Sequence, residues 1–527
     1  MGLINGSAYV MPQLQWATYD SPLLKIRRQT VRFRGQSRYA LQVLHAQLLL
    51  TSSKHGPICL GSRQRVANQP IPRTNSEDCL FLDLYAPSNA TDDSKLPVYV
   101  FIQGGGFNFN ANANLNGTSL VMASGRNIIV ITFNYRVSLY GFLASAEVQK
   151  GGSLNNGLLD QRKVLQWVQK YISKFGGDPN HVVMGGASAG GGSVALQVAA
   201  YGGRDDNVFH ATAAESQSFG AVRTIADSQY QYDQLVSRTK CTSKDTGHTD
   251  TLVCLRGLST AALQTQNIGT PFPGANSNPL FPYNPVIDHD FLQDLTFALF
   301  NSGRFHNVPA IYGDVTNEGT IFVPRNTDTV NESDFFLRAQ FPTINSTQLS
   351  TIQGLFPISQ YPHIKSAGNH WQSTSAAYGE LRYVCPGNYI GSQYYAHNSS
   401  SIVYNYHYNV TSPINTADGI GVPHVAELIA IWDPPSLPAS YKAGGLNANV
   451  IPLLQAYWTS FIRFYDPNVA RLPGSPRWEE WGGPNSQQRI RFQGGSNAAS
   501  DTVMETVPSD QKHRCEELIQ MGISLKQ

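Results

Sequence analysis

Charged residues are scarce in this chain of 527 residues, where Asp, Glu, Lys and Arg together make up 14%, against roughly 25% in an average soluble domain. The formal net charge is +2 and no block of like charges occurs, so no nucleic-acid partner is indicated. No apolar run approaches the roughly 18 residues of a membrane span. Composition therefore argues against a nucleic-acid-binding or membrane-spanning protein.

Signals for export, metal binding and domain division are also missing. The first eight residues lack a basic start followed by an apolar core, so no signal peptide is visible. None of the six cysteines has C-x-x-C spacing, so no metal site is expected. Without linkers or repeats, we expect one large domain over 59–527 and an atypical N-terminal segment over 1–58.

The most informative motif in the sequence is Gly-Ala-Ser-Ala-Gly at 186–190. A β-rich run, 181–185, precedes it, and an Ala/Gly/Val-rich run, 190–196, follows it. A strand that turns sharply into a helix leaves the turn residue strained and exposed, and small neighbours let the backbone close around it. Ser188 is therefore a candidate nucleophile.

From about residue 80, β-like runs alternate with helical ones, which predicts a mostly parallel sheet covered on both faces. A helix is expected over 159–175, where apolar residues recur at helical spacing. The segment 220–300 indicates an insertion above the sheet. The expected strands are 81–85, 98–102, 128–133, 181–185, 308–312 and 401–406.

A run of glycines, Gly104 to Gly106, directly follows the expected strand 98–102. Without a Cβ to block them, backbone N–H groups of such a run can point into a cavity. There they could stabilise the oxyanion of a tetrahedral intermediate. A tight turn and a phosphate-binding loop are the alternatives for the run taken alone.

A serine nucleophile needs a base and an orienting acid, which in α/β-hydrolases follow in the order Ser, Asp/Glu, His. After the strand 308–312, Glu318 is the preferred acid and Asp314 its rival. His424 stands in a turn before an apolar helix and is the preferred base. His397 and His407 lie in or beside a probable strand.

Together these motifs resemble the type-B carboxylesterase/lipase family, the cholinesterase-like branch of the α/β-hydrolases, and in particular its fungal secreted esterases. The resemblance runs from about Ser76 to the C-terminus. Besides the nucleophile turn, it is carried by Ser76-Glu-Asp-Cys-Leu80, Asn134-Tyr-Arg-Val137, Asn156-Gly-Leu-Leu-Asp-Gln-Arg162 and Phe175-Gly-Gly-Asp-Pro179.

This resemblance implies an α/β-hydrolase fold over 59–527 and a Ser-His-Glu triad that needs no cofactor. By the same resemblance, Ser218 corresponds to a buried serine beside the triad, and Glu77, Arg136 and Asp160 correspond to structural ion-pair members. The implied catalytic groups are Ser188, Glu318 and His424, with the oxyanion held by the amides of Gly105, Gly106 and Ala189.

The resemblance also implies disulfides Cys59–Cys79 and Cys241–Cys254. Cys385 either pairs with Cys515 or is a buried thiol. Paired cysteines imply an oxidising compartment, so secretion and glycosylation are expected although the family's opening strands and a signal peptide are missing, which suggests a truncated or mispredicted start. The sequons begin at Asn5, Asn89, Asn116, Asn331, Asn345, Asn398 and Asn409.

The segment from Cys59 to Cys79 bears on the substrate. Lipases of the resembled family place a long amphipathic lid here, whereas this segment is short and polar. It has no tryptophan to bind a quaternary ammonium by cation–π contact, and Ala187 replaces an acidic residue before the nucleophile, so no choline ester is expected. We predict a serine esterase for soluble or short-to-medium acyl esters; a triacylglycerol lipase and a non-catalytic binding protein are the alternatives, and the oligomeric state is open.

Overall fold

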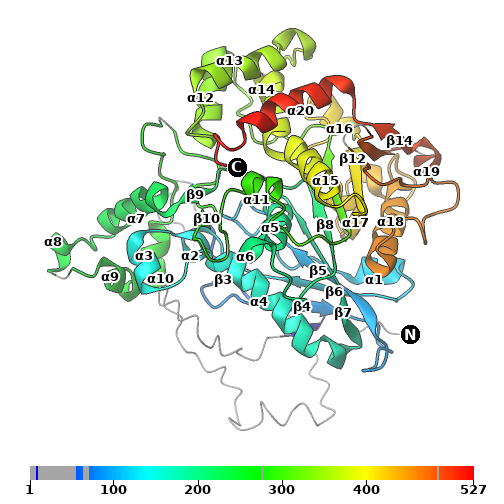
Figure 1. Cartoon of the computed structure of the whole chain (residues 1–527), viewed down its shortest axis with the longest axis horizontal. Helices are drawn as coiled ribbons and strands as arrows, with labels where there is room; N and C mark the ends of the chain where they lie inside the picture. Colours follow the sequence, from blue (N-terminus) through cyan, green and yellow to red (C-terminus); the bar gives the residue numbers. More distant parts are fainter. Residues whose placement is uncertain are drawn as a thin grey trace.

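A ten-stranded sheet forms the centre of the protein (Figure 1). Neighbouring strands from β6 to β13 pair in parallel, while β1, β4 and β14 at the two edges pair antiparallel. This confirms the expected mostly parallel sheet. The computed structural model describes residues 7–9, 55–62, 71–247, 249–275, 277–483, 486–495 and 497–527.

In spatial order the strands run β1-β4-β6-β5-β7-β8-β11-β12-β13-β14. Two small parallel pairs lie outside this sheet, β2 (Ile58–Cys59) with β3 (Asn75–Ser76) and β9 (Arg223–Thr224) with β10 (Val286–Ile287). The sheet strands are β1 (Ser7–Tyr9), β4 (Leu82–Tyr85), β5 (Leu96–Ile102), β6 (Ile129–Phe133), β7 (Gly177–Ala187), β8 (Ala211–Glu215), β11 (Ala310–Val315), β12 (Val403–Asn409), β13 (Gln488–Gln493) and β14 (Val503–Thr506).

Alternating side chains of the strands serve two separate cores, because successive residues of a strand point to opposite faces. In β5, Val98 and Val100 belong to the core beneath α4 (Asn156–Tyr171) and α5 (Ala189–Val198). Tyr99 and Phe101 belong to the opposite core, beneath α1 (Thr118–Ala123), α17 (Leu428–Trp432) and α18 (Val450–Phe464). Helices therefore cover both faces.

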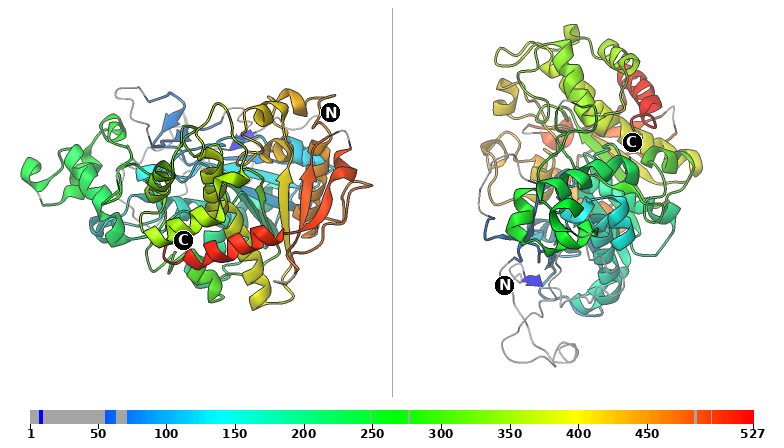
Figure 2. Two further views of the ribbon diagram at one scale, coloured as in Figure 1. Left: turned by 90° about the horizontal axis from the view of Figure 1, so that it is seen from above. Right: turned by 90° about the vertical axis from the view of Figure 1, so that its left-hand side faces the viewer.

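Two helical groups extend beyond these layers. Helices α7 to α10, part of the expected insertion, protrude at one end of the molecule, far from β14 (Figure 2). A third core joins α12, α13 and α14 to the C-terminal α20. The remaining helices are α2 (Ser138–Phe142), α3 (Ala146–Gly151), α6 (Ala200–Gly203), α7 (Ile225–Arg238), α8 (Ser243–Thr246), α9 (Thr251–Gly257), α10 (Thr260–Thr265), α11 (Thr296–Asn301), α12 (Val330–Gln340), α13 (Ser346–Leu355), α14 (Trp371–Gly379), α15 (Cys385–His397), α16 (Pro413–Ala417), α19 (Ala498–Asp501) and α20 (Ser509–Met521).

The expected elements are present with shifted ends. The predicted helix 159–175 begins earlier, at Asn156, and ends as an α-helix at Tyr171, after which a 3₁₀ turn continues to Phe175. Its start is set by Asn155, whose side chain bonds the backbone of Val286 from the distant insertion. Such a tertiary contact is invisible to local periodicity. In the described part of the chain no helix is long and apolar enough to cross a membrane.

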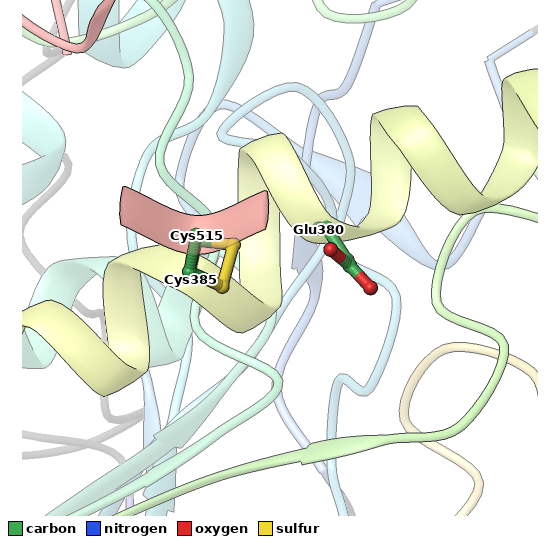
Figure 3. A group of neighbouring side chains, drawn as sticks. All are labelled: Glu380, Cys385 and Cys515. Atoms are coloured by element: carbon green, nitrogen blue, oxygen red, sulfur yellow. A yellow bond between two sulfur atoms is a disulfide. The ribbon is translucent and has the colours of Figure 1, made fainter. Parts of the chain in front are cut away.

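All three cysteine pairs form disulfides: Cys59–Cys79, Cys241–Cys254 and Cys385–Cys515. The last joins α15 to α20, with the carboxylate of Glu380 nearby (Figure 3). That carboxylate binds Arg514 through two hydrogen bonds of 2.6 and 2.8 Å.

The ion pair expected in the interior also forms: Arg136 contacts Asp160 at 2.6 Å, through its side chain and its backbone amide. Most of residues 1–58, the polar segment 63–70 and the sequon at Asn5 lie outside the described residues. The domain boundary at residue 59 therefore stays a prediction.

We predict that replacing both Cys385 and Cys515 by Ser lowers the free energy of unfolding by about 4–5 kcal/mol, because the bond closes a loop of 130 residues and so restricts the unfolded chain. Replacing both Cys241 and Cys254, which close a loop of 13 residues, should cost about 3 kcal/mol. Denaturant unfolding of both variants checks this. A smaller loss for the 385/515 pair than for the 241/254 pair contradicts it.

Candidate active site

Ser188 lies at the sharp turn between β7 and α5, with φ +58° and ψ −122°. These angles are strained for a residue with a side chain. The neighbours must be small: a Cβ on Gly190 would come within 2.0 Å of the carbonyl oxygen of Ile102. The Ser188 amide donates to the carbonyl of Glu215 at 2.9 Å, which ties the turn to the end of β8. The expected strand–turn–helix context is present.

The glycine run lies directly against this turn. A Cβ on Gly104 would be 2.9 Å from the Cβ of Ser188. Gly105 has φ +118°, and a Cβ there would be 2.1 Å from the carbonyl oxygen of Phe109. In the described chain, no oxygen accepts a hydrogen bond from the amides of Gly105, Gly106 or Ala189. The structure thus brings three unused N–H donors close to the serine.

His424 and Glu318 meet although 106 residues separate them. His424 Nδ1 is hydrogen-bonded to Glu318 Oε2, and both side chains are buried. The other oxygen of Glu318 accepts from the Val315 amide at 3.0 Å. His424 Nε2 has no hydrogen-bond partner among the described residues. The imidazole is therefore held by one nitrogen, which leaves the other available.

The two loops that carry these residues are joined by backbone contacts. Asn317 donates its amide to the carbonyl of Val422 at 2.9 Å, and its side chain accepts from the Val422 amide at 2.9 Å. Asn317 follows β11 and the histidine loop follows β12, two strands that pair in parallel register. Because the carboxyl ends of parallel strands share an edge, both loops lie at the same edge of the sheet as the turn after β7.

The rival residues are placed elsewhere. Asp314 is buried in β11 and accepts from Gln217 at 2.9 Å. His407 lies in β12, as predicted, and contacts Glu505 at 3.0 Å. His397 ends the helix α15 instead of lying by a strand, and contacts the carbonyl of Asn301 at 3.2 Å. Neither histidine is bonded to Glu318 or Asp314.

Burial governs the electrostatics of the site. It lowers the pKa of His424 below its usual range, because a charged imidazole would lose its hydration; Arg382 acts in the same direction and Glu427 opposes it. Burial likewise raises the pKa of Glu318, although the Val315 amide favours its charged form. The imidazole is therefore uncharged and able to accept a proton at neutral pH.

Further buried acids surround the pair and were not singled out from the sequence as part of the site. Glu427 accepts from Ser216 at 3.1 Å and from Tyr406 at 2.8 Å. Glu215 accepts from Tyr99 at 3.2 Å. Burial raises the pKa of both acids. Ser216 therefore contacts Glu427, whereas the suggested Ser218 contacts Arg382 (Nε–Oγ 3.0 Å).

An aromatic wall encloses the imidazole. The ring of Tyr383 is 4.4 Å from that of His424, and the ring of Phe322 is 5.0 Å from it. Phe281 covers the glycine run, since a Cβ on Gly106 would lie 2.0 Å from its ring. These residues come from insertions with no recognisable motif, so only the fold identifies them.

Comparison with known proteins agrees with this architecture. The model of the carboxylesterase family matches residues 46–509. EstA of Aspergillus niger has a similar crystal structure, with a TM-score of 0.84 and 38% identity over 92% of this chain and 90% of that one. The sheet and its covering helices are those of an α/β-hydrolase.

Curated fungal proteins are similar in sequence. Secreted lipase 4 of Gibberella zeae is 29% identical over 82% of this chain and 76% of its own length. Secreted lipase 1 of Botryotinia fuckeliana is 31% identical over 77% of this chain and 71% of its own length. The chain belongs to the carboxylesterase family, and it is a carboxylic-ester hydrolase.

We predict that Gly105→Ala lowers ester hydrolysis by about 100- to 1000-fold, the usual effect of losing one oxyanion donor. The added methyl group would meet the Phe109 carbonyl and force the φ of +118° to change, which turns the amide away. Steady-state rates on a p-nitrophenyl ester measure the loss. Gly257→Ala, at a position with open space around it, is the control, and equal rates for the two variants would contradict the assignment.

Proposed function

We propose that the protein is a serine esterase that works through an acyl-enzyme, with Ser188 as nucleophile, His424 as base and Glu318 as the orienting acid. The observation that supports this most is the buried hydrogen bond between Glu318 and His424, next to a strained serine turn lined by free amides. His424 Nε2 takes the Ser188 proton as Oγ attacks the ester carbonyl. The developing oxyanion accepts from the three amides.

Glu318 holds the tautomer with the proton on Nδ1 and stabilises the imidazolium once it forms. The imidazolium then gives its proton to the leaving alcohol. Water, activated in turn by His424, attacks the acyl-enzyme and releases the acid. The chain supplies every group of this cycle, so no cofactor is part of the proposal.

The preferred substrates in this proposal are soluble esters with short to medium acyl groups. A cavity of about 20 Å³ borders α5, with Phe107, Gly192 and Ser218 in its wall. A space of this size holds about one small group, such as the methyl of an acetyl group. A cavity this small on the helix that follows Ser188 supports a short acyl group in the substrate.

A triacylglycerol lipase is the second candidate. Relatives carry that name, including a secreted triacylglycerol lipase of Gibberella zeae that is 30% identical over 78% of this chain. A groove of about 290 Å³, lined in part by Leu280, Pro324 and Phe336, could hold a longer chain. A non-catalytic binding protein is disfavoured, because every position of the proposed triad is filled.

We also propose that the protein acts outside the cell. Relatives are named as secreted lipases, and three disulfides suit an oxidising compartment. The proposal includes glycosylation of the sequons that lie in the described part of the chain.

The triad is tested by four substitutions. Ser188→Ala should lower kcat by about 10⁶, and fluorophosphonate labelling should be lost with it. Glu318→Gln should lower kcat by about 10³- to 10⁴-fold, because the imidazole loses its orienting charge, whereas Asp314→Asn should cost less than about tenfold and His407→Gln should leave the rate near wild type. A larger loss for Asp314→Asn than for Glu318→Gln would reverse the choice of acid.

Substrate preference is tested with p-nitrophenyl esters of two to sixteen carbons, with and without an emulsion interface. We expect kcat/KM to peak at about two to four carbons, because the cavity that borders α5, the helix after Ser188, is small, and we expect no jump in rate above substrate solubility. A peak at long chains that appears only in emulsion would favour the lipase instead.

A further inference from the structure

Arg382 is a buried cation that contacts no acidic side chain among the residues the structure describes. Its side chain belongs to the π-helical turn Glu380–Val384, and the residue is 3% exposed. Of the other buried arginines among the described residues, Arg162 and Arg489 each contact a carboxylate and Arg223 does not. A buried charge without a partner is costly. We therefore expect the charge of Arg382 to have a functional role.

The guanidinium is held by rings and one hydroxyl. Its Cζ atom lies 5.1 Å from the centre of the Phe281 ring, 5.8 Å from that of Tyr378 and 5.9 Å from that of Tyr383. Its Nε donates to Ser218 at 3.0 Å. Cation–π contacts of this kind stabilise the charge without neutralising it, so its field reaches the surroundings.

The turn that carries Arg382 is fixed from several sides. The Phe219 amide donates to the Arg382 carbonyl at 2.9 Å, and Gln217 donates to that of Tyr383 at 2.8 Å. The disulfide from Cys385 to α20 anchors the end of the turn (Figure 3). The electrostatic effect of a charge depends on its distance from the affected group. These contacts, which fix the turn, therefore also fix the effect of Arg382 on the residue that shares the Tyr383 ring.

That neighbour is His424, whose imidazole lies 4.4 Å from the Tyr383 ring on which Arg382 also packs. Besides Arg382, the charged or titratable groups that face the imidazole are Glu318 after β11, Glu427 before α17 and Tyr383 itself. The two acids favour a proton on His424, and Arg382 opposes it.

Resting on the proposed esterase mechanism, we propose that Arg382 is a positioning residue whose unpaired charge keeps the imidazole of His424 unprotonated in the resting enzyme. A proton taken from solvent adds one positive charge beside the guanidinium, which repels it. The chemical step instead creates a positive charge on the imidazole and a negative one on the carbonyl oxygen together. The net charge is unchanged, so Arg382 affects resting protonation far more than the chemistry.

The test is the pH profile of kcat/KM on p-nitrophenyl butyrate. Because the pKa of His424 is lowered, activity of the wild type should persist below pH 6.5 (the value of a free histidine). Arg382→Met removes the repulsion and raises that pKa, so the acidic limb should move to higher pH by about half to one unit. At acidic pH this is a loss of about 3- to 10-fold, while the plateau should fall less than about threefold.

Arg382→Lys keeps the charge and should restore the acidic limb. Arg223→Met is the matched control: Arg223 is also 3% exposed, packs on Phe272 at 4.1 Å and lacks a carboxylate partner among the described residues, and its loss should leave the limb in place. Arg382→Gln also removes the charge and should shift the acidic limb as Arg382→Met does. It replaces the Met variant in the test if that variant does not fold.

The role of the charge would be overturned if the acidic limb of the pH profile stayed in place in the Arg382→Met and Arg382→Gln variants. It would also be overturned if the limb moved as far in Arg382→Lys as in Arg382→Met. A lower plateau with an unmoved limb would make Arg382 purely structural. Failure of the proposed function would look different, because the Ser188→Ala variant would then hydrolyse esters at the wild-type rate.

Discussion

The hydrogen bond between Glu318 and His424 organises the whole edge of the sheet where the site lies. It requires two loops to meet, and they meet because β11 and β12 are parallel neighbours in register from Ala310 with Val403 to Val315 with Tyr408. The backbone contacts of Asn317 with Val422 then hold the loops together. A slip of one residue between these strands would turn each side chain to the opposite face and separate the pair.

The hydrogen bond between Glu318 and His424 is shielded from water, which affects the charges of both groups. Glu318 and His424 are both shielded, and aromatic rings close the space around the imidazole. In such surroundings charges are costly, so the additional acids Glu215 and Glu427 have raised pKa values and favour the neutral form. Charge at the proposed base is consequently controlled by few groups, among them the guanidinium of Arg382.

Much of the architecture could be predicted from local patterns. Nearly unbroken apolar runs predicted β5 and β6, because a strand between two helical layers must be apolar on both faces. The sharp turn at Ser188 was predictable from its small neighbours, and the structure shows why they are small: a Cβ on Gly190 would meet Ile102. The preference for Glu318 over Asp314 came from its place before a glycine, and the disulfides Cys59–Cys79 and Cys241–Cys254 came from resemblance to a family; the structure forms these disulfides and the contact of Glu318 with His424.

Other parts of the site carry no local signal. Ser216 was passed over for Ser218, because two serines in one short segment cannot be told apart until Ser216 is seen to reach Glu427. The elements that bring Arg382, Phe281 and Phe322 to the site lie in insertions whose directions depend on distant contacts.

The sequence by itself determined the strands, the strained turn and the free amides of the glycine run, because these follow from sterics and side-chain alternation among neighbours in the chain. Only the tertiary structure decided which acid meets His424, which serine meets Glu427 and which cation packs on the ring of Tyr383. Those outcomes depend on the register of strands and on burial, and both are properties of contacts between residues far apart in the chain.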